Sequence, residues 1–303
     1  MTNPNRMHLL AEHAALERLI ADTPEDEVLD RGSMSARLEE LEQRIAKAGA
    51  DEREPARVRL TFRGSPVVGS HGIFAEFGSK AVSTFAESVA AMAASMAGPL
   101  APMGPIPNRE QHQMLITSTA LGSFGFELEE HRTGQLTLED ASPVAQALER
   151  TQRLLQGTLG SDEELADSAF EADERALDKV RAFLQTLSDN DAWCAMEVGG
   201  DLVTFASADQ VRTSLARLSH DNIREEEQTL TGELRGALPD GRVFEFKLAE
   251  DGLVIRGKVG PTIQDAEDLN RHLRQPASIQ VKVRRVGNGR PRYVLLQLTE
   301  TKK

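Results

Sequence analysis

The chain has one cysteine, Cys194, and few aromatic residues, at 4% of the sequence. A single cysteine excludes an internal disulfide and a metal site made of cysteines alone. One tryptophan and one tyrosine leave no aromatic ladder of the kind on which single-strand-binding proteins stack bases. No apolar run reaches the roughly 20 residues that span a bilayer, and the first residues lack a basic segment followed by an apolar one. We therefore expect a cytoplasmic bacterial protein with no membrane segment.

Catalytic and ligand-binding motifs are also missing. The seven histidines show neither H-E-x-x-H nor another tight ligand spacing, so we expect no metal and no cofactor. Ser123 lies in LGSFG, whereas a nucleophile elbow requires Gly-x-Ser-x-Gly. These absences weigh against an enzyme.

Charge is present in quantity but is unevenly distributed. The net charge is −13, yet residues 253–303 hold 11 Lys and Arg against 4 Asp and Glu, which leaves 24 against 44 in the rest of the chain. Such an asymmetry favours different partners for the acidic and the basic parts, or an attraction between the two parts themselves.

The first 50 residues predict a helical hairpin. Apolar residues recur at helical spacing over 8–22, and a second stripe follows the break at Thr23-Pro24. This second stripe lies within 28–47 and steps by four, three and four, as in a coiled-coil seam: Met34, Leu38, Leu41 and Ile45. Because so short a stripe is unstable alone, the segment 28–47 is expected either to mediate self-association or contact with another protein, or to pack on its own chain.

Residues 55–220 predict an α+β body with a central mixed sheet covered by helices. RVRLTFRG (57–64) alternates apolar and polar side chains, as a half-buried strand does, and 115–130 is expected in the same sheet. Helix 79–96, with Ser79 as its N-cap, is expected to cover the apolar side. The remaining elements are helices at 141–157, 161–187 and 207–218, and a hairpin at 190–205.

Residues 224–303 predict a small β-barrel of the SH3 or OB kind. Five short alternating stretches are joined by PDG, EDG and GNG turns, with one helix near 262–274. The fold class is therefore α+β in three parts: a helical hairpin (1–50), a body (55–220) and a basic barrel (224–303).

The first candidate site is a row of alternate residues at the end of the predicted strand 115–130 and just after it. Glu127, Glu129 and His131 occupy alternate positions, and carboxylates beside a histidine are suited to general acid–base catalysis. The same row is typical of the water-facing side of an antiparallel strand, where arginines of the preceding strand would pair with it.

The second candidate is an anion site in the Gly-rich stretch 69–80, at Gly78, Ser79 and Lys80, where amides at a helix start would meet a phosphate. The spacing is not that of a P-loop, because five residues separate Gly72 from Gly78 and Ser79 precedes Lys80. A buried turn at the sheet edge is the alternative interpretation.

The third candidate is a polyanion-binding surface on the barrel, formed by Lys282, Arg284, Arg285, Arg290 and Arg292. If 278–284 and 292–298 pair as a hairpin, these cations gather at one end of the barrel. The alternative is that they contact the acidic segment 161–174 or an acidic partner protein.

The leading functional hypothesis is a non-enzymatic interaction or regulatory protein, oligomeric, whose acidic body and basic barrel bind different partners. The second is nucleic-acid binding through 224–303. The third is an enzyme that acts on a phosphorylated substrate through the 69–80 loop.

Overall fold

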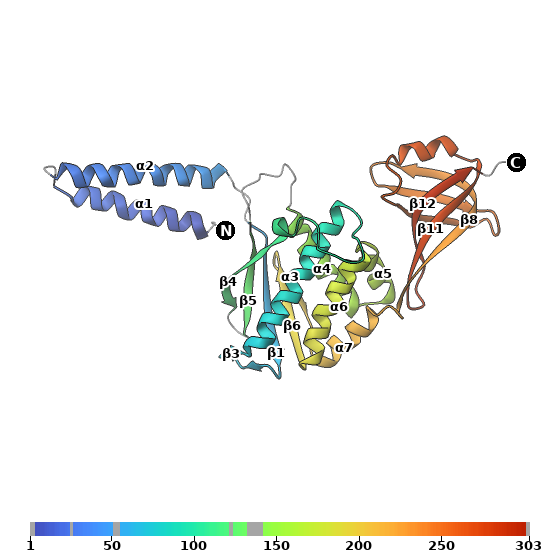
Figure 1. Cartoon of the computed structure of the whole chain (residues 1–303), viewed down its shortest axis with the longest axis horizontal. Helices are drawn as coiled ribbons and strands as arrows, with labels where there is room; N and C mark the ends of the chain where they lie inside the picture. Colours follow the sequence, from blue (N-terminus) through green and yellow to red (C-terminus); the bar gives the residue numbers. More distant parts are fainter. Residues whose placement is uncertain (1–3, 25–26, 51–54, 121–123, 132–141, 301–303) are drawn as a thin grey trace. The chain divides into compact units, whose positions relative to one another are not determined.

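The computed structural model describes residues 4–24, 27–50, 55–120, 124–131 and 142–300 (Figure 1). The chain combines helices with antiparallel sheets and a closed C-terminal barrel, which confirms the α+β class. None of the helices within these ranges is long and apolar enough to cross a membrane.

The first part of the chain is a pair of helices, α1 (Pro4–Asp22) and α2 (Val28–Ala50), that pack on each other. They form a compact unit of their own, and the rest of the described chain forms a second compact unit. Among the side chains that the structure describes, the core of the pair contains Leu9, Leu16 and Leu41. Three further side chains pack against it partly buried: Ile20, Met34 and Leu38. The side chain of Ile45 lies outside the described set.

A five-stranded sheet forms the centre of the body. Its strands are β1 (Arg57–Gly64), β4 (Met114–Ala120), β5 (Gly125–Glu130), β6 (Ala192–Val198) and β7 (Asp201–Thr204). Their order is β4-β5-β1-β6-β7, and every neighbouring pair is antiparallel. The expectation that 57–63 and 115–130 lie in one sheet is confirmed, although 115–130 contains two strands, β4 and β5. The expectation of a mixed sheet is wrong. Short connections join β4 to β5 and β6 to β7, and connections of this length allow only antiparallel pairing.

Helices cover the apolar face of this sheet (Figure 1). They are α3 (Ala75–Ala97), α4 (Pro143–Leu159), α6 (Glu174–Asp189) and α7 (Ala208–Arg217), whereas α5 (Asp162–Phe170) packs on α4 and on the barrel. The core is continuous from sheet to helices: the rings of Phe62 on β1 and Phe77 on α3 lie 5.7 Å apart, edge to face. Two short elements complete the body, the hairpin of β2 (Val67–Val68) with β3 (Gly72–Ile73) and the 3₁₀ helix η1 (Arg109–His112).

Two helix boundaries differ from the sequence prediction. α3 begins at Ala75 with Phe74 as N-cap, so Ser79 is not a cap but lies inside the helix. The helix begins earlier than the predicted residue 79 because Phe77 is a buried core residue of its first turn. The predicted helix 161–187 is two helices, because the Asp173 side chain accepts from the amide of Arg175 at 2.9 Å and starts α6 as a new helix.

The barrel contains β8 (Ile223–Leu238), β9 (Val243–Leu248), β10 (Val254–Val259), β11 (Pro276–Val286) and β12 (Arg292–Glu300). It is closed in the order β10-β12-β11-β8-β9, with β10 and β12 parallel and the other pairs antiparallel. The expected pairing of 278–284 with 292–298 is confirmed. The helix predicted near 262–274 is the shorter 3₁₀ helix η2 (Glu267–His272). Ile223, the first residue of β8, and Val286, the last residue of β11, are buried in the core of the body. These two barrel strands therefore pack against the body at one end.

Candidate functional site

The acidic row on β5 lies in a ladder of cross-strand contacts. Glu129 accepts a hydrogen bond from Nε of Arg57 on β1 at 2.9 Å, and Glu127 accepts one from the hydroxyl of Ser118 on β4 at 2.6 Å. His131, just beyond the strand, donates from its backbone amide to the carbonyl of Gln113 at 2.9 Å. In the described ranges, no hydrogen bond or ion pair joins His131 to either carboxylate. This is the arrangement that cross-strand pairing of a water-facing row predicts.

The residues of the predicted anion site lie within α3 rather than before it. The amide of Gly78 donates to the carbonyl of Phe74 at 2.9 Å, and the hydroxyl of Ser79 donates to the carbonyl of Glu76 at 3.1 Å. Lys80 is exposed on the helix surface. A Cβ on Gly78 would lie 3.2 Å from the Ile73 side chain, so this glycine lets the helix approach β3 closely. Its amide is already bonded inside the helix.

The predicted cationic surface of the barrel faces an acidic helix of the body. Arg292 lies 3.0 Å from a carboxylate oxygen of Glu163 and 2.7 Å from one of Asp167, both on α5. The amide of Arg290 donates to Glu163 at 3.2 Å. These contacts lower the pKa of Glu163, mainly through the Arg290 amide and then through the Arg292 guanidinium. Within this chain, then, acidic body and basic barrel bind each other at α5.

The other predicted cations differ in their surroundings. Arg284 is buried, and its guanidinium bonds both the Glu225 carboxylate of β8 and backbone carbonyls at the end of α5. Burial acts to raise the pKa of Glu225, but the charges and hydrogen bonds of Arg284 and Lys282 outweigh it and hold that pKa below its usual value. Arg285 is exposed and lies opposite Arg224 in the β8–β11 register.

One cluster of possible metal ligands was not found from the sequence. Glu174 and Asp178, one turn apart on α6, lie close to His220. The guanidinium of Arg181 occupies their centre, with Nη1 2.8 Å from the Glu174 carboxylate and 2.6 Å from that of Asp178. The charge that a cation would supply is therefore already present. The i, i+4 spacing of the two acids was the only sequence signal.

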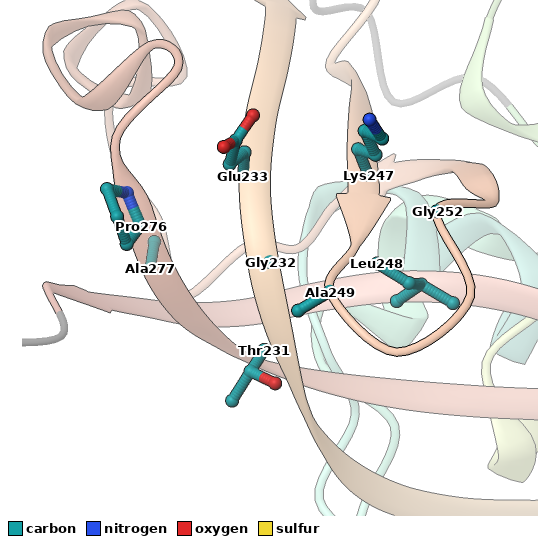
Figure 2. Close-up of a pocket in the computed structure, with 9 residues that line it drawn as sticks. All are labelled: Thr231, Gly232, Glu233, Lys247, Leu248, Ala249, Gly252, Pro276 and Ala277. Atoms are coloured by element: carbon teal, nitrogen blue, oxygen red, sulfur yellow. The ribbon is translucent and has the colours of Figure 1, made fainter.

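A cavity of about 410 Å³ lies in the barrel wall at β8, β9 and the start of β11. Figure 2 shows Glu233 and Lys247 on neighbouring strands, with the loop that carries Gly252 beside them. The wall is tightly packed at Gly232, where a Cβ would lie 2.0 Å from the Lys247 carbonyl oxygen. Glu233 also pairs with Arg235 at 3.2 Å. Lys247, which lines the same cavity, has no ion pair among the described residues.

A second cavity, of about 470 Å³, lies on the face of the sheet opposite the buried core, over β1, β6 and β7. Arg63 lies opposite Trp193, and Arg59 lies opposite Glu197 with a closest charge separation of 3.8 Å. The alternation of β1 predicted that its arginines face outward. The sequence did not indicate Trp193 as a neighbour, because the β1–β6 pairing joins segments 130 positions apart.

The comparisons with known proteins give no relative for this chain: no family model, no curated protein and no solved structure matches it.

Proposed function

We propose that this chain is a cytoplasmic, non-enzymatic interaction protein that self-associates through its N-terminal helices. The observation that supports this is the small core of the α1–α2 pair, which holds three buried side chains among those described. A pair of helices whose described side chains bury so little apolar surface is marginal alone in water. Met34 and Leu38, on the stripe of 28–47, are only partly covered, and Leu19 is 54% exposed. A second copy of the pair would cover them.

The test is the mass of the full chain in solution, by size exclusion with light scattering, against the 33.2 kDa of a single chain. We expect a multiple of that mass, and Leu19→Glu is expected to shift it toward a single chain. Ala21→Glu is the matched control, because it adds the same charge roughly 200° around the same helix. A wild-type mass of one chain at every protein concentration would overturn the proposal.

Nucleic-acid binding through the barrel is the second candidate, and the strand order favours it. A five-stranded barrel in which the third and fifth strands run parallel, with a short helix between the third and fourth, has the connectivity of an OB-fold. Barrels of this kind bind oligonucleotides on their second and third strands and on the loops after the first and fourth strands. In this chain those strands are β9 and β10, and they carry the exposed cation Arg256 beside Glu245.

The loop after the fourth strand, residues 287–291, contacts α5 through the Arg290 amide. A nucleic-acid strand bound at this loop would therefore lie close to an acidic helix. The test is binding of a labelled single-stranded DNA by the full chain, measured by anisotropy over a series of salt concentrations. The slope of log affinity against log salt concentration should become shallower by about one in Arg256→Ala. Lys179→Ala on α6 removes the same charge from the body and should leave this slope unchanged. Absence of binding at about 50 mM salt, where such contacts are strong, would rule this candidate out.

A further inference from the structure

The cavity on the outward face of the sheet combines a cation, an aromatic ring and hydroxyl groups in one place. Its lining includes Arg59, Thr61, Arg63, Trp193, Glu197 and Thr204. Its volume of about 470 Å³ lies within the roughly 300–1,000 Å³ that small-molecule sites occupy. The cavity is on a sheet, so its floor is held by the β1–β6 and β6–β7 ladders rather than by a loop.

The charges along this cavity are not balanced. Arg59 has the Glu197 carboxylate 3.8 Å away, whereas Arg63 is exposed and forms no ion pair within the described ranges. Arg63 and Trp193 are direct cross-strand neighbours, which places their Cβ atoms about 5 Å apart. An arginine without an ion pair among the described residues is thus the cross-strand neighbour of the only tryptophan of the chain.

We propose that this cavity binds a mononucleotide, with the phosphate on Arg63 and the base against the indole of Trp193. A guanidinium forms bidentate, charge-assisted hydrogen bonds with phosphate oxygens. An indole offers a flat apolar face on which a base stacks. The proposal goes beyond the self-association proposed above and does not depend on it.

The rest of the lining matches the remaining parts of such a ligand. Thr61 and Thr204 supply hydroxyl groups that donate to or accept from a ribose or a base edge. Glu197 places a negative charge at the opposite end of the stretch of β6 that starts at Trp193, so a phosphate is favoured at the end beside Arg63.

Trp193 is the only tryptophan of the chain, so its fluorescence reports directly on this cavity. The experiment is a titration of the full-length protein with adenosine monophosphate, with adenosine and inorganic phosphate as separate arms. We expect saturable quenching by the nucleotide with a Kd below about 1 mM, and at least about tenfold weaker binding of adenosine and of phosphate, because each lacks one of the two contacts.

Arg63→Gln is expected to weaken nucleotide binding by at least about tenfold. Arg57→Gln is the matched control, since Arg57 lies on the same face of β1 but pairs with Glu129 outside the cavity. Circular dichroism verifies that both variants fold, and proton NMR line broadening of the nucleotide gives a readout independent of the indole. No saturable effect by either readout, or equal losses in the two variants, would overturn the proposal, as would equal affinity for adenosine and its monophosphate.

Discussion

The guanidinium of Arg284, on barrel strand β11, donates a hydrogen bond at 2.9 Å to the backbone carbonyl of Ala172, just beyond the end of helix α5. The same side chain bonds the carbonyl of Ala169 and the carboxylate of Glu225. The last carbonyls of a helix lack partners within the helix, and a cationic side chain is one way to satisfy them. One arginine of the barrel therefore completes a helix of the body and neutralises a carboxylate of β8.

Arg284→Ala is expected to destabilise the protein by about 1.5–3 kcal/mol, because it removes charge-assisted hydrogen bonds to the Ala172 carbonyl and to Glu225 and leaves Lys282 as the remaining ion-pair partner of Glu225. Its sequence neighbour provides the control: Arg285 is exposed, and Arg285→Ala should change stability by less than about 0.5 kcal/mol. Denaturant unfolding of both variants measures the difference. Equal midpoints would contradict the structural role given to Arg284.

A second prediction separates the two faces of the central sheet. Phe62→Ala should cost about 3–5 kcal/mol, because Phe62 is completely buried between sheet and helices. Phe126→Ala should cost less, since that ring is only partly buried against the same core. Glu129→Ala removes a partly exposed pair with Arg57 and should cost about 1 kcal/mol or less. Matched denaturant melts test this order, and a loss for Glu129→Ala as large as that for Phe62→Ala would contradict it.

The buried faces of β1 and α3 could be predicted from the sequence. Apolar residues recur with a period of two in a strand and of 3.6 in a helix, and this period indicates which face is buried. The start of α3 was not, because it depends on Phe77 reaching the core formed by Phe62, a residue of another element. A serine is a common N-cap, but tertiary packing set the boundary four residues earlier than that local preference suggested.

The candidate sites show the same limit. Arg284 and Arg285 are identical neighbours in the sequence, yet one is 8% exposed and the other lies on the surface. Ile279, Val281 and Val283 of β11 are buried in the barrel core, as the alternation of this stretch indicates, but the alternation carries no information on which outer residues α5 covers. The pairing of Arg63 with Trp193 was equally hidden, because strand order within a sheet follows from the whole fold and not from either strand.

A third prediction concerns acid stability. His112 in η1 is buried, and its Nδ1 has no hydrogen-bond partner among the described residues. Burial lowers the pKa of His112, and this outweighs the Gln111 backbone hydrogen bond and the nearby charge of Glu130, which act to raise it. The unfolded chain therefore binds a proton first as the pH falls below the ordinary value of 6.5.

The contribution of His112 to stability should consequently be fully present above pH 6.5 and be lost as the pH falls from there through the lowered pKa of His112 in the folded state. His112→Gln should flatten this part of the profile of unfolding free energy against pH, whatever it does to stability at neutral pH. His71→Gln, in the exposed β2–β3 turn, is the control. A slope that persists unchanged in His112→Gln would assign the acid sensitivity to other groups.

The last prediction tests the close packing of the barrel at β8. A Cβ added at Gly232 would lie 2.0 Å from the carbonyl oxygen of Lys247 and 2.8 Å from the ring of Phe246, whereas at Gly236 on the same strand it would meet nothing within 4 Å. Backbone atoms of a closed barrel cannot retreat without breaking the β8–β9 ladder. Gly232→Ala should therefore destabilise the chain by about 1–3 kcal/mol, as overpacking of a core does.

Gly236→Ala should be neutral or slightly stabilising, because alanine restricts the unfolded chain and meets no neighbour in the folded one. Thermal and denaturant unfolding of the two variants, made in the same full-length chain, compare these outcomes directly. Equal unfolding midpoints for Gly232→Ala and Gly236→Ala would contradict this prediction. They would mean that β8 and β9 lie farther apart at Gly232 than in the structure, where a Cβ would lie 2.0 Å from the Lys247 carbonyl oxygen.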